Sequence, residues 1–206
     1  QNDKTPICTD WQTRLPDDQW AEAEQRIDTQ GTQHNIAVRA GQLTTRPDTS
    51  IAIIDMDNPT ARRHATAGLK RMGLDTVTVR TASRSGRHAY ILVSGVPSHF
   101  NYTHLNTSIG KGEFRAGRGA YVTAPCSEID GTCYVFMQGN IETLTTQRVI
   151  EWQDLQWLLP DVLPPPPTTE ELPLKLQHRL MPVHTLSLLE WCANASKGEG
   201  IGNYRT

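Results

Sequence analysis

The chain has 206 residues, of which 37% are hydrophobic and 20% are charged. This composition is typical of a globular protein with one sizeable core and a small appendage, and it excludes a disordered chain. No run of about 18 apolar residues occurs, so no membrane-spanning helix is expected. The four cysteines form no CxxC pair, which argues against a small disulfide scaffold and favours a reducing, cytoplasmic setting.

The net charge of −2 conceals an uneven distribution along the chain. Between residues 59 and 118 the sequence holds ten Lys or Arg against two acids, a local net charge of +8, so the remainder carries −10. Two interpretations stay open. The excess can form a basic face that meets phosphate groups, or it can be a solvated helix surface.

The first predicted elements are a helix over residues 17–28, with acidic residues in its first turn, and a short strand over 35–39. The apolar, β-branched run 50–55 predicts a central strand buried on both faces.

A second helix follows this central strand. Asn58 can cap it and Pro59 suits its first position, so the helix should run to about Met72 and end at Gly73.

Hairpins and single helices alternate in the rest of the first 163 residues, which predicts an α+β fold with a mixed sheet rather than a doubly wound parallel one. Asp130-Gly131 is a strong hairpin turn signal. The predicted elements are strands over 76–81, 88–93, 120–124 and 133–136, and a closing helix over 152–159.

The four prolines at 164–167 indicate a linker, because such a run forms a stiff, extended spacer. We therefore expect a first domain over residues 1–163, a Pro-rich linker over 164–173 and the start of a helical domain over 174–206. The segment 174–206 is predicted to contain a helix from Leu186 onward. The chain is interpreted as a piece of a longer protein.

The first candidate chemical element is Asp55-Met56-Asp57, at the end of the central strand. Residues two apart in a strand share a face, so the two Cα atoms lie roughly 6.5 Å apart. Two carboxylates at this spacing can bridge a pair of divalent ions about 3.5–4 Å apart. Alternatively, the two acids merely flank a helix N-terminus.

The second element is the segment 83–88, which reads Ser-Arg-Ser-Gly-Arg-His. Its backbone N–H groups, the hydroxyls of Ser83 and Ser85 and the guanidinium of Arg87 are suited to a triphosphate. His88 begins the next strand, where a histidine can equally be structural.

The third element is Gly112-Glu113-Phe114-Arg115. Glu113 and Arg115 share a face in any extended stretch, which offers an acid for metal binding and a base for phosphate. An exposed surface ion pair is the alternative.

These three elements in this order resemble the primase-polymerase domains of the archaeo-eukaryotic primase superfamily, in particular those of plasmid and phage replication proteins. That family has a DxD or DxE strand end, an S-x-H strand start and then a single acid. Two flanking segments are also similar: 35–38 with Gly41, and 119–127 with Gly131 and Tyr134. The resemblance covers about residues 34–136.

The resemblance implies a DNA primase and DNA polymerase that transfers nucleotides on a template with two Mg²⁺ or Mn²⁺ ions. It also implies an RNA-recognition-like catalytic module beside a second α/β module. The expected partners are a single-stranded DNA template, a primer strand, dNTP or NTP substrates and a helicase region downstream, with no membrane. By the same resemblance, Asp55, Asp57 and Glu113 would bind the metals, and His88 would touch the nucleotide's phosphates. The nucleotide pocket would also include Ser83, Ser85, Arg87 and Arg115. The family usually has Asp where this chain has Glu113.

No zinc site is expected, because Cys126 and Cys133, with His99 and His104, match no standard ligand spacing. In a hairpin that turns at 130–131, Glu128 rather than Cys126 lies opposite Cys133, so we interpret the thiols as buried or idle.

Two alternative functions fit parts of the sequence. One is a non-catalytic module of a replication initiator that binds single strands or origin DNA. The other, a rolling-circle nuclease, needs paired histidines on one strand, whereas His88-Ala89-Tyr90 offers one.

Overall fold

The computed structural model describes residues 21–22, 24–25 and 35–163. The chain divides into two compact units, Gln1–Pro164 and Pro165–Thr206, and every described residue lies in the first. Of the helix predicted over 17–28, the four described residues are helical. The Pro-rich linker and the helix from Leu186 lie outside the described residues, so the domain division stays a prediction.

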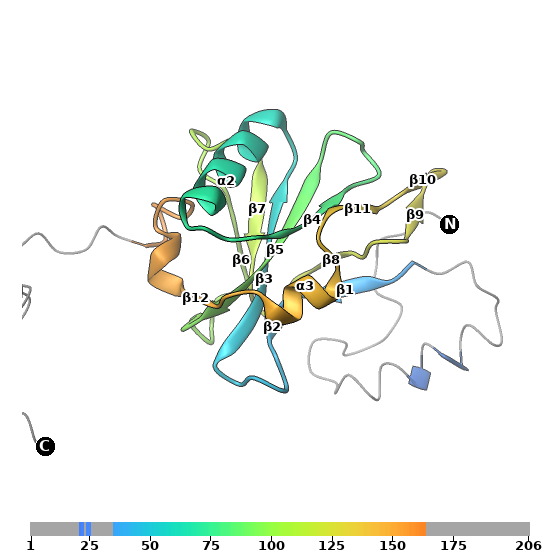
Figure 1. The fold of residues 1–206 in the computed structure, drawn as a ribbon, viewed down its shortest axis with the longest axis horizontal. Coiled ribbons are helices and arrows are strands. Elements are labelled where there is room, and N and C mark those ends of the chain that lie inside the picture. The colour runs from blue at the N-terminus through green and yellow to red at the C-terminus, as the bar shows by residue number, and fades with distance from the viewer. Residues whose placement is uncertain (1–20, 23, 26–34, 164–206) are drawn as a thin grey trace, which may run out of the picture. The chain divides into compact units, whose positions relative to one another are not determined.

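An eight-stranded mixed sheet forms the centre of the described region (Figure 1). Its strand order is β11-β4-β5-β3-β7-β6, with β2 added to β3 and β12 added to β5. Every pairing is antiparallel except that of β12 with β5. The predicted α+β class is therefore confirmed. The strands are β2 (Gly41–Gln42), β3 (Thr49–Met56), β4 (Val77–Arg80), β5 (Arg87–Ser94), β6 (Tyr102–His104), β7 (Gly112–Arg115), β11 (Val135–Gln138) and β12 (Ile150–Glu151).

Strand β3 lies at the centre of the sheet, as its β-branched run predicted. Ala52, Ile53 and Ile54 are all fully buried. Because side chains alternate along a strand, Ala52 and Ile54 join the core on one face, whereas Ile53 joins the core on the other. The same alternation points Asp55 to the face of Ile53.

Helix α2 (Pro59–Arg71) covers the first of these faces (Figure 1). The side chain of Asn58 accepts a hydrogen bond from the Ala61 amide, and Gly73 has a φ of 65° just after the helix. Both ends thus agree with the sequence. Residues of α2, of the sheet and of segment 152–163 form this core: Ala52, Ile54, Met56, Ala61, Ala65, Leu69, Leu74, Ala89, Ile91, Val93, Phe114, Trp152, Leu155, Leu158 and others.

The closing helix predicted over 152–159 is wrong in type and length. A 3₁₀-helix, η1 (Trp152–Leu155), is followed by turns as far as residue 163. Pro160 disfavours α-helical backbone in the residue before it. The turns instead bury Leu158 and Leu159 against the sheet and α2.

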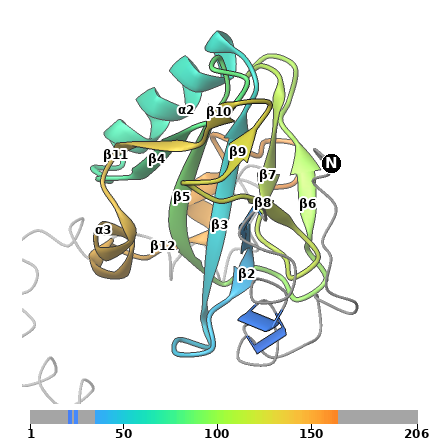
Figure 2. The ribbon, with the colours of Figure 1, turned by 90° about the vertical axis from the view of Figure 1, so that its right-hand side faces the viewer.

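Two small ribbons cover the other face of the sheet, on the side opposite to α2 (Figures 1 and 2). Strand β1 (Ala37–Arg39) pairs with β8 (Tyr121–Thr123), and β9 (Glu128–Ile129) pairs with β10 (Thr132–Cys133). Their apolar residues pack on the sheet in a second core: Ala40, Ile53, Val77, Val79, Tyr90, Ala120, Val122, Ile129 and Tyr134.

The β9–β10 hairpin turns at Asp130-Gly131, where both residues have positive φ, and it pairs Glu128 with Cys133 as expected. The single strand predicted over 133–136 is instead broken at Tyr134, which separates β10 from β11. The Tyr134 amide donates to the Ser127 carbonyl at 2.8 Å, and its buried ring joins the second core.

Cys126 and Cys133 are free thiols, and both are exposed, so they are not buried, and the alternative that they are idle stays a prediction. The absence of zinc stays a prediction.

Four elements of the described region had no counterpart in the sequence analysis: β2, β6, β12 and the short helix α3 (Ile141–Thr146). Asn140 caps α3 and forms a capping box with Thr143. None of the helices that the structure describes is long and apolar enough to cross a membrane.

Candidate active site

The register of four adjacent strands places the candidate residues in one row. Asp55 on β3 lies opposite His88 on β5 and opposite Glu113 on β7, and Glu113 in turn lies opposite His104 on β6. Residues directly opposite each other point to the same face, with Cβ atoms about 4.5–5.5 Å apart. Three motifs that are separated in the sequence therefore meet on one face, the one not covered by α2.

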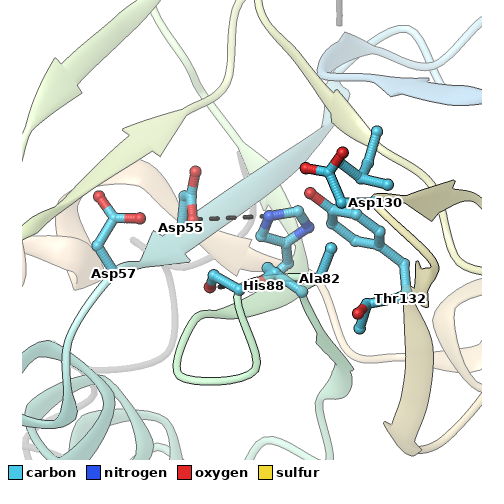
Figure 3. A pocket seen from close by; sticks show the side chains of 10 residues that line it. Asp55, Asp57, Ala82, His88, Asp130 and Thr132 are labelled. Atoms are coloured by element: carbon cyan, nitrogen blue, oxygen red, sulfur yellow. Dashed lines mark hydrogen bonds and ion pairs between the residues drawn. The ribbon is translucent and has the colours of Figure 1, made fainter. Parts of the chain in front are cut away.

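The contacts within this row involve two histidines and two carboxylates. Nε2 of His88 lies 3.6 Å from Oδ1 of Asp55, a contact that Figure 3 marks with a dashed line. Nδ1 of His104 lies 3.3 Å from Oε1 of Glu113. His88 is 4% exposed and packs beside Tyr134, with ring centroids 5.8 Å apart. The imidazole of His88 is therefore held firmly against the end of the central strand.

Arg115 supplies the positive charge nearest to the carboxylates. It lies in the neighbouring row, and its guanidinium forms an ion pair with Glu113 and approaches Oδ2 of Asp55 at 3.9 Å. It also donates to the Tyr121 carbonyl at 3.1 Å. The sequence suggested phosphate binding for Arg115, whereas in this structure the side chain bridges two acids.

Asp57 follows β3 and extends its ladder by one step, because its amide donates to the Lys111 carbonyl at 3.0 Å. It is exposed, and it directly precedes Asn58, the cap of α2. Figure 3 shows Asp57 beside Asp55 at the same end of the strand. The strand end and the helix start thus place the second carboxylate at the rim of the site.

A pocket of about 340 Å³ opens beside the two aspartates, a volume within the usual range of about 300–1,000 Å³ for small-ligand sites. One side is the end of β3 with His88, another is the loop 81–83, and the third is the β9–β10 hairpin with Tyr134 (Figure 3). The lining residues are Asp55, Asp57, Thr81, Ala82, Ser83, His88, Ile129, Asp130, Thr132 and Tyr134.

Hydrogen bonds of side-chain hydroxyl groups stabilise the loop between β4 and β5. Oγ of Ser83 lies 2.8 Å from Oγ1 of Thr81 and accepts from the Gly86 amide at 3.1 Å. A Cβ at Gly86 would lie 2.4 Å from Oγ1 of Thr81, so a side chain there would disrupt the turn. Ser83 therefore both lines the pocket and fixes its wall.

Ser85 and Arg87 do not line this pocket. Arg87 turns back onto its own loop, where it donates to the carbonyls of Arg84 at 3.0 Å and Gly86 at 2.8 Å. It also alternates with His88 and so points to the other face of the sheet. Burial, and after it the charges of Arg62 and Arg80, lower the pKa of Arg87.

Sequence reasoning missed the hairpin wall of the pocket, formed by Ile129, Asp130 and Thr132. The Asp-Gly turn signalled a hairpin, but no local pattern says over which part of the sheet a hairpin folds. Tyr90, one row below His88, is also buried in the site face. Burial, followed by the influence of Asp55 and Tyr134, raises its pKa far above the ordinary value, so its hydroxyl stays protonated.

The carboxylates of Asp55, Asp57 and Glu113 do not converge on one point. Within residues 35–163 and the four described before them, no group of three or more His, Cys, Asp or Glu side chains is placed to hold a metal ion. Glu113 stands next to Asp55 in register, but it is turned toward Arg115 and His104 and does not line the pocket.

A protein-family model described as "Bifunctional DNA primase/polymerase, N-terminal" matches residues 1–152. A search of the curated proteins gives no match. The matched segment contains every residue of the row and of the pocket described above.

Proposed function

The chain belongs to the family of bifunctional DNA primase/polymerase N-terminal domains, and we propose that its site catalyses template-dependent nucleotidyl transfer with two divalent ions. The observation that carries the proposal is the in-register row of His88, Asp55 and Glu113 beside a pocket of about 340 Å³. We place this activity in the replication of a plasmid or phage, with a helicase region elsewhere in the protein, on the family resemblance alone.

The donor set suits Mg²⁺ or Mn²⁺, since both prefer oxygen ligands and Asp55, Asp57 and Glu113 offer carboxylates. The Arg115 guanidinium contacts two of these acids, Asp55 and Glu113. A positive charge is therefore stabilised between them. When bound, the ions would activate the primer 3′-oxygen and neutralise the triphosphate. Arg115 must then release at least one carboxylate, while the Tyr121 carbonyl continues to hold its other nitrogen.

The remaining residues of the pocket would orient the nucleotide. His88 stands at the pocket wall with one nitrogen against Asp55, where it would donate to a phosphate oxygen. The loop that Ser83 braces would line the triphosphate. Because Asp130 is acidic, we assign the hairpin side of the pocket to the sugar and base rather than to the phosphates.

A non-catalytic DNA-binding module is the second candidate function. It is supported by the pairing of Glu113 with Arg115 and His104, which engages this acid with protein side chains.

One experiment separates the two candidates. The chain is incubated with labelled nucleotides, Mg²⁺ or Mn²⁺ and single-stranded DNA, with and without an annealed primer, beside the variant Asp57→Asn. We expect the parent to incorporate nucleotide and Asp57→Asn to retain strand binding while it loses incorporation, because the loss of a ligand removes transition-state stabilisation. A variant that extends primers at more than a few per cent of the parent rate would remove Asp57 from the site. A parent that binds DNA without incorporation would favour the second candidate.

A further inference from the structure

An exposed aromatic residue stands at one edge of the sheet. Tyr102 on β6 is 52% exposed, and β6 is the last strand of the described sheet order. Tyr102 lies opposite Arg115, in the row next to Glu113, so its side chain is on the same face as the carboxylates. Its ring meets the ring of His104 edge to face, with centroids 6.1 Å apart.

The position of Tyr102 relative to the pocket indicates which of the two substrates it can contact. The pocket lies on the β4–β5 side of Asp55 and is lined by the loop 81–83 and His88. Tyr102 lies on the opposite side, two strands away, beyond β7. Nucleotidyl transfer joins two substrates at one point. If the nucleotide fills the pocket, the strand end that attacks it must approach from the β7–β6 side.

The segment that carries the exposed Arg118 lies against the start of β6, next to Tyr102 in sequence. The amides of Ala116 and Gly117 donate to the carbonyl of Asn101 at 3.0 and 2.8 Å, so the loop that carries the exposed Arg118 is fastened to the start of β6. The Arg118 guanidinium donates to Oε1 of Gln42 at 3.2 Å, on the strand that follows Arg39. Burial and then the charge of Arg118 lower the pKa of Arg39. Two cations held near each other on one surface favour an anionic partner.

Resting on the proposed function, we infer that Tyr102, Arg118 and Arg39 form the docking surface for the nucleic-acid strand that carries the attacking 3′-hydroxyl. The ring stacks on a base near the strand end and the two guanidinium groups meet its phosphates. Alternating aromatic and basic side chains are the usual construction of a surface for single strands. His104, between Tyr102 and Glu113 in space, links this surface to the carboxylates.

The chain offers a matched control. Phe136 on β11 is also an exposed aromatic residue, at 36%, and its register with Val79 places it on the same face but at the other edge of the sheet. Single exposed aromatic residues are common on protein surfaces. Phe136→Ala therefore measures what the loss of any such ring does.

The test is fluorescence anisotropy of a fluorescein-labelled single-stranded oligodeoxynucleotide, titrated with the whole chain in the absence of nucleotide and metal. Tyr102→Ala should weaken strand binding by about 5- to 150-fold, which is the contribution of one stacked base. Tyr102→Phe should bind as the parent does, since it keeps the ring. Arg118→Gln should reduce the slope of log affinity against log salt by about 0.7, as expected for one phosphate contact.

Thermal melting of each variant checks the fold, and nucleotide KM is measured in parallel. Equal strand affinity of Tyr102→Ala and the parent would overturn the inference, as would an equal loss in Phe136→Ala. A parent that binds strands through Tyr102 but incorporates no nucleotide would contradict the proposed function and leave the docking surface intact. A parent that binds no strand would overturn both.

Discussion

The contact between β7 and β3 sets the distance between Glu113 and Asp55, and Gly112 makes this contact possible. A Cβ at position 112 would lie 2.1 Å from the Asp55 carbonyl oxygen and 3.1 Å from Cδ1 of Leu105. Gly112→Ala must therefore open the first contact to at least 3.0 Å, a movement of about 1 Å. Because the obstacle is backbone, no side chain can rotate away, and β7 itself must move from β3 with Glu113.

The expected cost follows from these distances. Overpacking of this kind costs typically about 1–3 kcal/mol of unfolding free energy, and a displacement of about 1 Å at an active site can cost about 100-fold in rate. We expect Gly112→Ala to remain folded, to bind nucleotide nearly as the parent does, since Glu113 does not line the pocket, and to extend primers about 100-fold more slowly. Urea denaturation and single-turnover primer extension measure the two effects.

Gly68→Ala is the matched control. Its Cβ would lie 2.1 Å from the ring of Trp157, a similar clash on the α2 side of the sheet. The overpacking is partly offset by a gain of about 1 kcal/mol in helix propensity, so a net loss of about 0–2 kcal/mol is expected with primer extension unchanged. The reasoning is refuted if folded Gly112→Ala extends primers at the parent rate, or if Gly68→Ala slows extension equally.

Four further outcomes are expected. His88→Ala should chiefly raise the KM for nucleotide, because a phosphate contact present in ground and transition states acts as uniform binding; unchanged KM and rate would assign His88 a structural role. Glu113→Gln should be inactive. Glu113→Asp should keep substantial activity if the metal site tolerates either acid, and should lose it if β7 is placed to suit Glu. Primer-extension rates distinguish the two cases. An active Glu113→Gln variant would exclude Glu113 from the site. Tyr90→Phe should leave stability unchanged or raise it by up to about 1 kcal/mol, since the buried hydroxyl meets no hydrogen-bond partner in the described part of the chain; a clear drop in the urea midpoint would reveal a missing partner. Truncation after residue 163 should preserve primer extension but weaken de novo primer synthesis, and equal losses in the two assays, with the fold intact, would place the tail in the catalytic unit.

The parts of the fold that the sequence predicted best have strong local signals. The run of β-branched residues in β3 and the Asn58-Pro59 start of α2 each determine their own conformation. The strand that carries Glu113 was expected only as an extended stretch, because β7 has four residues and a single large apolar one, Phe114. Strand β6 was not expected at all, because its three residues carry no alternating pattern that would identify a strand.

Of the residues named from the sequence, Asp55, Asp57, Ser83 and His88 line the pocket, but their arrangement was not predictable. The spacing of Asp55 and Asp57 gave their common face, whereas the pairing of β3 with both β5 and β7 could not be read from one segment. The bridge from Arg115 to two carboxylates also depends on that pairing. Conversely, Arg87 was grouped with His88 because they are adjacent in sequence, although the alternation of a strand places adjacent residues on opposite faces.

The central claim, template-directed transfer at the row of His88, Asp55 and Glu113, is tested most directly by single-nucleotide incorporation. Four primer–template duplexes that differ only in the templating base are each offered the four nucleotides with Mg²⁺ or Mn²⁺, for the parent and for Asp55→Asn of equal thermal stability. We predict that the parent adds mainly the complementary nucleotide, only when metal is present, and that Asp55→Asn adds less than a few per cent as much. Incorporation that ignores the template, or that persists in Asp55→Asn, would contradict the account.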